Sequence, residues 1–126
     1  MKEWTIKVFQ DDNSYCDFLD WREKMPVKAK ARMDVIIEYL EVTKDWKNTP
    51  YIKQLKGYKG IHEIRFTVSN IQYRPLGCYG PDKKSFVFLI GAKEQGDEFN
   101  PRNAPWKAAK RKKRIFEERR YIREYQ

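Results

Sequence analysis

The sequence has few cysteines, no secretory start and no long apolar stretch. Cys16 and Cys78 stand 62 positions apart without the paired spacing of a zinc or redox motif, so we expect both to be free thiols. The longest apolar run, Phe86 to Ile90, is too short to span a bilayer, and the N-terminus lacks the apolar core of a signal peptide. We therefore expect a cytoplasmic protein with no membrane partner.

The motifs of cofactor-dependent and metal-dependent enzymes are missing as well. The sequence contains no Gly-rich phosphate loop, no cluster of metal ligands and no Ser or Cys nucleophile beside a base. It has a single histidine, His62. We expect no metal, no small-molecule cofactor and no cofactor-driven chemistry.

Positive charge is what the chain has in excess. Its 126 residues fit one domain, residues 1–126, and carry 27 Lys and Arg against 18 Asp and Glu, a formal net charge of +9. Residues 101–126 hold ten of these cations and three glutamates, which gives +7 for this segment and +2 for the rest. Because Lys and Arg displace counterions from phosphate backbones, this asymmetry favours a polyanionic partner such as RNA. A basic segment that only aids solubility is the alternative.

The first half of the chain alternates in a way that predicts one strand and two helices. Apolar residues at every second position predict a strand at 4–8. Spacings of three and four then predict a helix from 15 to 25 and a second from 26 to 42, which together form a hairpin. Residues 43–60 lose this pattern and are expected to form a loop.

The second half predicts a run of strands followed by a helix. Strand candidates lie at 61–68, 71–79 and 85–93, and the last is apolar on both faces, which is typical of a central strand. A polar loop is expected at 93–100, and a basic helix at about 101–124.

Pro75 interrupts the second of these strand candidates. Proline cannot donate to a sheet ladder, so we expect a kink beside Arg74. The whole pattern predicts an α+β fold in two layers: an antiparallel sheet of about four strands, an N-terminal helical hairpin and a C-terminal basic helix.

The segment His62-Glu63-Ile64-Arg65 is the first candidate for chemistry. Strand alternation places Glu63 and Arg65 on one face, and His62 with Ile64 and Phe66 on the other. A carboxylate beside a guanidinium can accept a proton and hold a phosphate. A simple ion pair on a solvated sheet face is the alternative. For His62, packing at the edge of the core is favoured over general acid chemistry, although imidazole titrates near neutral pH.

Arg74 and Lys93 are the other catalytic candidates. Antiparallel pairing can bring Arg74 close to Arg65, with either a phosphate or Glu63 between the two guanidinium groups. Lys93 ends the central strand, where it would neutralise the charge of a phosphorane or be an ordinary strand-end lysine.

Further cations and aromatic side chains are candidates for RNA binding. Aromatic rings can stack on unpaired bases, although most of the 19 aromatic residues must form the core. Tyr58 and Tyr79 are general stacking candidates. The specific candidates are Lys53, Lys56, Lys59, Tyr73, Phe99, Lys110, Arg111, Lys113 and Arg114. For those in the basic helix, a solvated helix face is the alternative.

Three segments together resemble a known family. Leu55-Lys-Gly-Tyr-Lys-Gly-Ile-His-Glu-Ile-Arg65, Ile71-Gln-Tyr-Arg-Pro-Leu-Gly77 and Leu89-Ile-Gly-Ala-Lys93 are similar to the phage Gp49-like branch of the RelE/HigB toxin superfamily. The resemblance in element order runs from Trp4 to Phe116. It implies a RelE-like antiparallel sheet carrying a helical hairpin. It also implies cleavage of mRNA, usually on the ribosome, until a cognate antitoxin protein neutralises the toxin.

The same resemblance implies roles for individual residues. Arg65 matches a basic residue of the active strand, Arg74 a phosphate-binding arginine, and Lys93 a later basic site residue. Phe99 falls where some relatives carry a tyrosine, and Glu63 where well-studied relatives have a lysine. These two departures favour a non-catalytic RNA- or ribosome-binding module of the same fold as the alternative function.

The function that the sequence predicts is metal-independent endoribonuclease activity. A base, Glu63 or His62, takes the proton of a 2′-hydroxyl, the oxygen attacks the adjacent phosphorus and the 5′-oxygen leaves. On this prediction Arg74→Ala lowers activity far more than folding stability. The expected partners are mRNA, the ribosome and an antitoxin. A third possibility is a protein-interaction domain whose basic helix docks an acidic partner.

Overall fold

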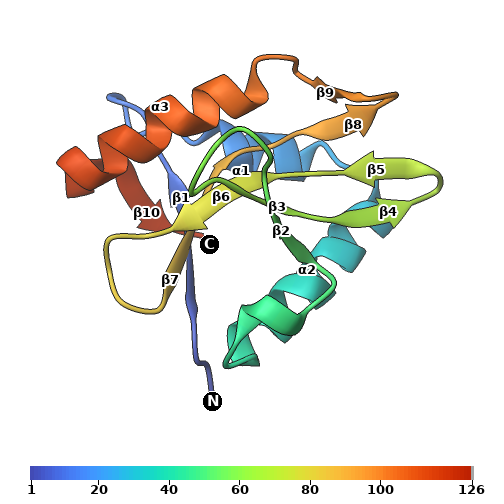
Figure 1. The fold of residues 1–126 in the computed structure, drawn as a ribbon, viewed down its shortest axis with the longest axis horizontal. Helices are drawn as coiled ribbons and strands as arrows, with labels where there is room; N and C mark the ends of the chain where they lie inside the picture. The colour runs from blue at the N-terminus through green and yellow to red at the C-terminus, as the bar shows by residue number, and fades with distance from the viewer. Residues whose placement is uncertain (126) are drawn as a thin grey trace.

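A six-stranded sheet forms the centre of the computed structural model, which describes residues 1–125 (Figure 1). In sheet order its strands are β10 (Ile122–Glu124), β1 (Thr5–Phe9), β7 (Ser85–Ile90), β6 (Leu76–Tyr79), β3 (His62–Ile64) and β2 (Ile52–Gln54). All six residues of β7 are buried, which confirms the prediction that this apolar strand is central. The pairing is antiparallel except between β1 and β7, which run parallel.

A second, four-stranded antiparallel sheet extends from the first. It consists of β4 (Phe66–Val68), β5 (Ile71–Tyr73), β8 (Lys93–Gln95) and β9 (Glu98–Asn100), in that order. The predicted strands 61–68 and 71–79 are therefore each divided between two sheets, and the prediction of about four strands is wrong. The predicted kink at Pro75 is confirmed, because this residue separates β5 from β6.

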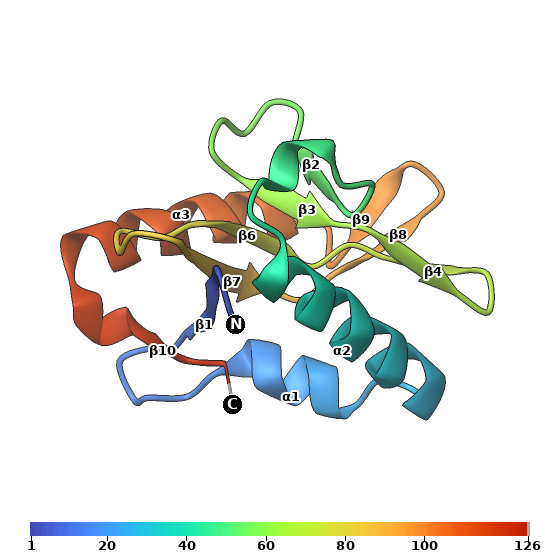
Figure 2. The same ribbon diagram turned by 90° about the horizontal axis from the view of Figure 1, so that it is seen from below.

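Within residues 1–125, three α-helices cover the larger sheet from both sides. The predicted hairpin is confirmed as α1 (Asp17–Glu23) and α2 (Val27–Val42), and α3 (Ala104–Glu117) lies across the opposite face (Figure 2). Alternation along β7 explains this arrangement. Phe86 and Phe88 pack into the core under α1 and α2, while Val87 and Leu89 pack into the core under α3. The fold is α+β as predicted. It has three layers instead of two, because helices cover both faces of the larger sheet.

Two segments expected to be loops contain regular structure. Residues 43–60 include a 3₁₀ turn, η1 (Trp46–Asn48), and β2, which pairs with β3. Residues 93–100 form a hairpin of β8 and β9. β2 and β8 are each only three residues long. Such short polar strands depend on their partner strands more than on their own sequence.

The basic helix ends earlier than expected. The prediction of a helix to residue 124 is wrong, because α3 stops at Glu117 and is followed by the 3₁₀ turn η2 (Arg119–Tyr121) and by β10. Tyr121 is buried, and its ring stacks on that of Phe9 with centroids 6.0 Å apart. This contact with β1 outweighs the helix propensity of the arginine-rich segment and turns the chain back along the sheet.

The sequence also predicts the state of the two cysteines and the absence of a membrane span and of a metal site. Cys16 and Cys78 are free thiols, as expected, and both are buried. Burial raises the pKa of the Cys78 thiol to about 12, so this sulfur stays protonated and unreactive. In residues 1–125 no helix has the length and apolarity needed to cross a membrane. No group of three or more potential metal ligands occurs in the same range.

Candidate nucleic-acid interface

Four charged side chains gather where the chain passes between the two sheets. Arg65 lies between β3 and β4, and Arg74 lies between β5 and β6. Arg65 Nε is 3.2 Å from Glu63 Oε1, and Arg74 Nε is 3.3 Å from Glu94 Oε1. Burial raises the pKa of Glu63, and the charges of both arginines oppose this rise, so they do belong to one cluster. The negative charges that balance the two arginines are the carboxylates of Glu63 and Glu94.

Arg74 is a structural cross-link within this cluster. Its Nη1 donates to the carbonyl oxygens of Tyr73 and Phe66, at 2.8 and 3.3 Å, and its Nη2 donates to Gln72 Oε1 at 2.8 Å. The ion pair with Glu94 adds a contact to β8. The buried guanidinium therefore ties β4, β5 and β8 together, and both of its terminal nitrogens are already engaged.

Arg65 is the arginine that an outside phosphate can reach. Its side chain is 38% exposed, whereas that of Arg74 is 6% exposed. Its partner Glu63 is buried, and this burial raises the pKa of the Glu63 carboxyl although the neighbouring arginines lower it. A carboxyl group with a raised pKa holds a proton more readily, which suits a general base. The Glu63–Arg65 pair is therefore an accessible cation beside a poised proton acceptor.

Lys93 lies on the other side of the smaller sheet. Cross-strand partners in an antiparallel pair share a face, and Lys93 pairs with Tyr73 while Glu94 pairs with Gln72. Lys93 and Tyr73 line a small cavity with Trp21 and Met25 near the α1–α2 turn. The structure thus separates Lys93 from the face that holds Arg74 and Glu94.

His62 packs at the edge of the core, as the sequence favours. Its ring is half-buried and meets the ring of Tyr79 edge-on, with centroids 5.0 Å apart. Desolvation lowers the pKa of His62, and the nearby charge of Lys112 lowers it further. The imidazole is therefore kept neutral. It belongs to the opposite strand face from Glu63, so the two candidate bases do not share one site.

The lowered pKa of His62 makes stability depend on pH. In the unfolded chain His62 titrates near its ordinary value of about 6.5, so as the pH falls through that value the unfolded state binds a proton that the folded state does not. We expect the free energy of unfolding of the wild type to fall, relative to that of His62→Gln, as the pH drops below about 6.5. Urea denaturation of both proteins across this range measures the difference, and a constant difference would contradict the prediction.

The candidate RNA-binding residues fall into accessible and inaccessible groups. Lys53, Lys56 and Lys59 are exposed and form no ion pair within residues 1–125. Tyr73 is 1% exposed, so its ring cannot stack on a base. Phe99 is partly buried against the core under α3.

The cations of α3 divide in the same way. Arg111 donates to both carboxylate oxygens of Asp17, at 2.9 and 2.8 Å, and to the carbonyl of Leu89 at 2.8 Å. Arg114 binds Asp12 at 3.2 Å and the Tyr121 hydroxyl at 2.9 Å. Both arginines therefore hold the fold together. Lys110 and Lys113 are exposed and have no carboxylate partner in the described part of the chain.

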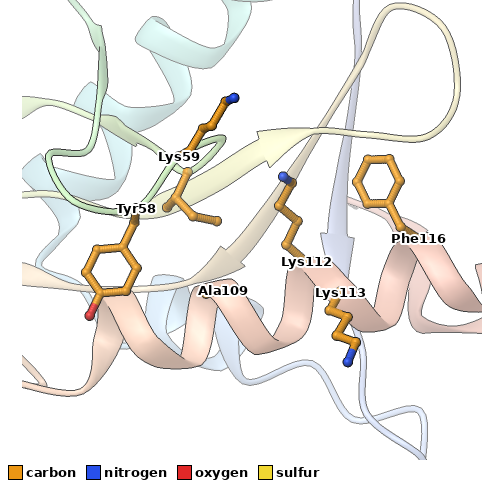
Figure 3. A pocket seen from close by; sticks show the side chains of 7 residues that line it. Tyr58, Lys59, Ala109, Lys112, Lys113 and Phe116 are labelled. Atoms are coloured by element: carbon orange, nitrogen blue, oxygen red, sulfur yellow. The ribbon is translucent and has the colours of Figure 1, made fainter.

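A pocket of about 300 Å³ lies between the loop 55–61 and α3 (Figure 3). Its lining residues are Tyr58, Lys59, Ile61, Ala109, Lys112, Lys113 and Phe116. The sequence alone does not predict that these residues line one pocket. One signal was present, since the four residues from α3 are spaced three and four apart and so form a single stripe of the helix.

Fold and surface together define a small α+β module with a cationic face built from α3, the loop 55–61 and β2. The family model described as phage derived protein Gp49-like (DUF891) matches residues 20–118. The chain therefore belongs to this family, which confirms the Gp49-like part of the resemblance. No curated protein and no solved structure matches the chain.

Proposed function

We propose that this chain is a toxin-like endoribonuclease of the RelE/HigB type that cleaves mRNA without a metal ion. The observation that supports the chemistry is the Glu63–Arg65 pair: a buried carboxylate with a raised pKa, 3.2 Å from an accessible guanidinium. Lys53 lies directly across from Glu63 in the β2–β3 register and adds an exposed cation beside the pair. Membership of the Gp49-like family supports the assignment to a toxin-like class.

In the proposed reaction Glu63 accepts the proton of a 2′-hydroxyl group. The 2′-oxygen forms a bond to the adjacent phosphorus, the bond from phosphorus to the 5′-oxygen breaks, and water supplies the proton to the leaving oxygen. Arg65 donates to the non-bridging oxygens as their charge grows. Once Glu63 is protonated it carries no negative charge and holds Arg65 less strongly. The guanidinium then turns to the phosphate, whose oxygens are gaining negative charge.

The remaining site candidates act outside this step. Arg74 and Glu94 hold together β4, β5 and β8, the strands of the smaller sheet next to the pair, and Lys93 lies on the other face of that sheet. The exposed lysines Lys53, Lys56, Lys59, Lys110 and Lys113 would bind the RNA backbone, and on the ribosome they would meet ribosomal RNA. A cognate antitoxin that covers this cationic face completes the proposal.

The first test is cleavage of a defined mRNA in EDTA, with and without programmed ribosomes. We expect strand breaks that leave a 2′,3′-cyclic phosphate, in EDTA as well as without it. A matched substrate with a single 2′-deoxy sugar on the 5′ side of the main cleavage site should lose that break and keep the others. Cleavage of the deoxy position at the normal rate would show that the 2′-hydroxyl is not the nucleophile.

One observation favours a second candidate, a non-catalytic RNA- or ribosome-binding module. Both terminal nitrogens of Arg74 donate within the fold and Lys93 lies across the sheet, so only one of the three matched basic residues faces the proposed site. This module would bind RNA with an affinity that falls steeply with salt, and would leave the RNA intact. Binding and cleavage measured on the same preparation separate the two functions.

A further inference from the structure

The pocket between the loop 55–61 and α3 combines an apolar base with a positively charged rim. Ile61 and Ala109 supply apolar surface, and the lining contains three lysines and no carboxylate. Tyr58 and Phe116 are both exposed aromatic residues and lie at opposite ends of the pocket, with Lys112 between them (Figure 3). Its volume of about 300 Å³ is at the lower end of the range for small-ligand sites.

Gly60 allows the lysine at the centre of the pocket to reach the loop. Its φ is +82°, a backbone conformation that favours glycine. A Cβ at this position would lie 2.5 Å from Lys112 Nζ, so the missing side chain is the space that the ammonium group occupies. No ion pair of Lys59, Lys112 or Lys113 occurs within residues 1–125. Three cations therefore border apolar and aromatic surface without any carboxylate to balance them.

We propose that this pocket is a binding subsite for one nucleotide of single-stranded RNA. The base lies against Ile61 and Ala109 and stacks on Tyr58 or Phe116, and Lys59, Lys112 and Lys113 bind its phosphates. Every base has an aromatic face and every nucleotide a phosphate, which is the combination that the lining offers. The subsite rests on the proposed function and extends it, because it fixes the path of the RNA along α3, beyond the Glu63–Arg65 pair.

The test measures binding of a short 2′-O-methyl oligoribonucleotide to the full chain. The methyl group blocks the 2′-oxygen, so the probe is bound without being cleaved. We expect Phe116→Ala, Tyr58→Ala and Lys112→Gln each to weaken binding, with about a 5- to 150-fold loss for an aromatic residue that stacks on a base. An abasic oligonucleotide of the same length should bind the wild type more weakly, and should be insensitive to the two aromatic changes.

The chain offers matched controls for these variants. Trp106 is 53% exposed and lies on α3 outside the pocket, while Phe116 is 50% exposed and lines it. Trp106→Ala and Lys28→Gln, an exposed lysine of α2, should leave binding within about twofold of the wild type. Thermal unfolding of every variant checks that the fold is intact.

Three outcomes would overturn the subsite. They are equal losses in Phe116→Ala and Trp106→Ala, equal affinity of the wild type for the abasic probe, and displacement of the RNA probe from the pocket by a glutamate-rich peptide that binds more tightly. The last would assign the pocket to an acidic protein segment. Failure of the proposed function is distinguishable: pocket-dependent binding without mRNA cleavage keeps the subsite and removes the nuclease. If the pocket variants leave both mRNA cleavage and RNA binding unchanged, the subsite is wrong and the nuclease is kept.

Discussion

Arg65→Ala lowers the rate of RNA cleavage by about 10²- to 10³-fold, the usual cost of removing one donor to a developing oxyanion. The guanidinium is the accessible cation of the Glu63–Arg65 pair, and no other arginine of the cluster offers free terminal nitrogens to an outside phosphate. Cleavage of a defined mRNA under single-turnover conditions measures the effect.

Two further variants make this result interpretable. Arg65→Lys keeps the charge and loses the fork of donors, so it should retain part of the activity. Arg102→Ala removes a largely exposed arginine that pairs with Glu98, and should cleave as the wild type does. If Arg65→Ala folds normally and cleaves at the wild-type rate, Arg65 has no part in the reaction.

Arg74→Ala lowers the free energy of unfolding by about 1–3 kcal/mol, the usual cost of leaving buried hydrogen-bond acceptors without their donor. The change leaves two main-chain carbonyls and Gln72 without their donor, and Glu94 without its cation. Urea denaturation of the wild type and the variant gives the difference. This reverses the prediction from the sequence, by which Arg74→Ala affects activity far more than stability.

The control for Arg74 is a double variant. Arg74→Met with Glu94→Gln removes both charges and keeps much of the volume, so it should recover part of the lost stability. A loss below about 0.5 kcal/mol in Arg74→Ala would place this arginine among ordinary surface residues and contradict the structural role.

The parts of the fold that could be predicted are those set by local sequence. The two-residue alternation of β1, the helical spacing of α1 and α2 and the uninterrupted apolar run of β7 each determine an element without reference to the rest of the chain. Pro75 marked a break for an equally local reason, its missing N–H. The short strands β2, β8 and β9 lack such signals and form because a neighbouring strand offers a ladder.

The candidate site was only partly predictable for a related reason. Alternation within one strand places Glu63 and Arg65 together, and the structure confirms their contact. The separation of Lys93 from Arg74 depends on the register between β5 and β8, and the engagement of Arg74 depends on Glu94 from that other strand. The pocket depends on how α3 packs on the loop. None of these long-range alignments can be read from spacing along the chain.

The pairing of β10 with β1 joins two ends of the sequence that a ribosome makes at different times. Phe9 is opposite Ile122, so one edge of β1 has no hydrogen-bond partner until residues 122–124 have left the exit tunnel. During that interval the nascent chain carries its cationic helix, but the edge of β1 is open and Tyr121 does not yet stack on Phe9. In the finished fold β10 occupies this edge, so the backbone groups of β1 on that side are not free to pair with a strand of another chain.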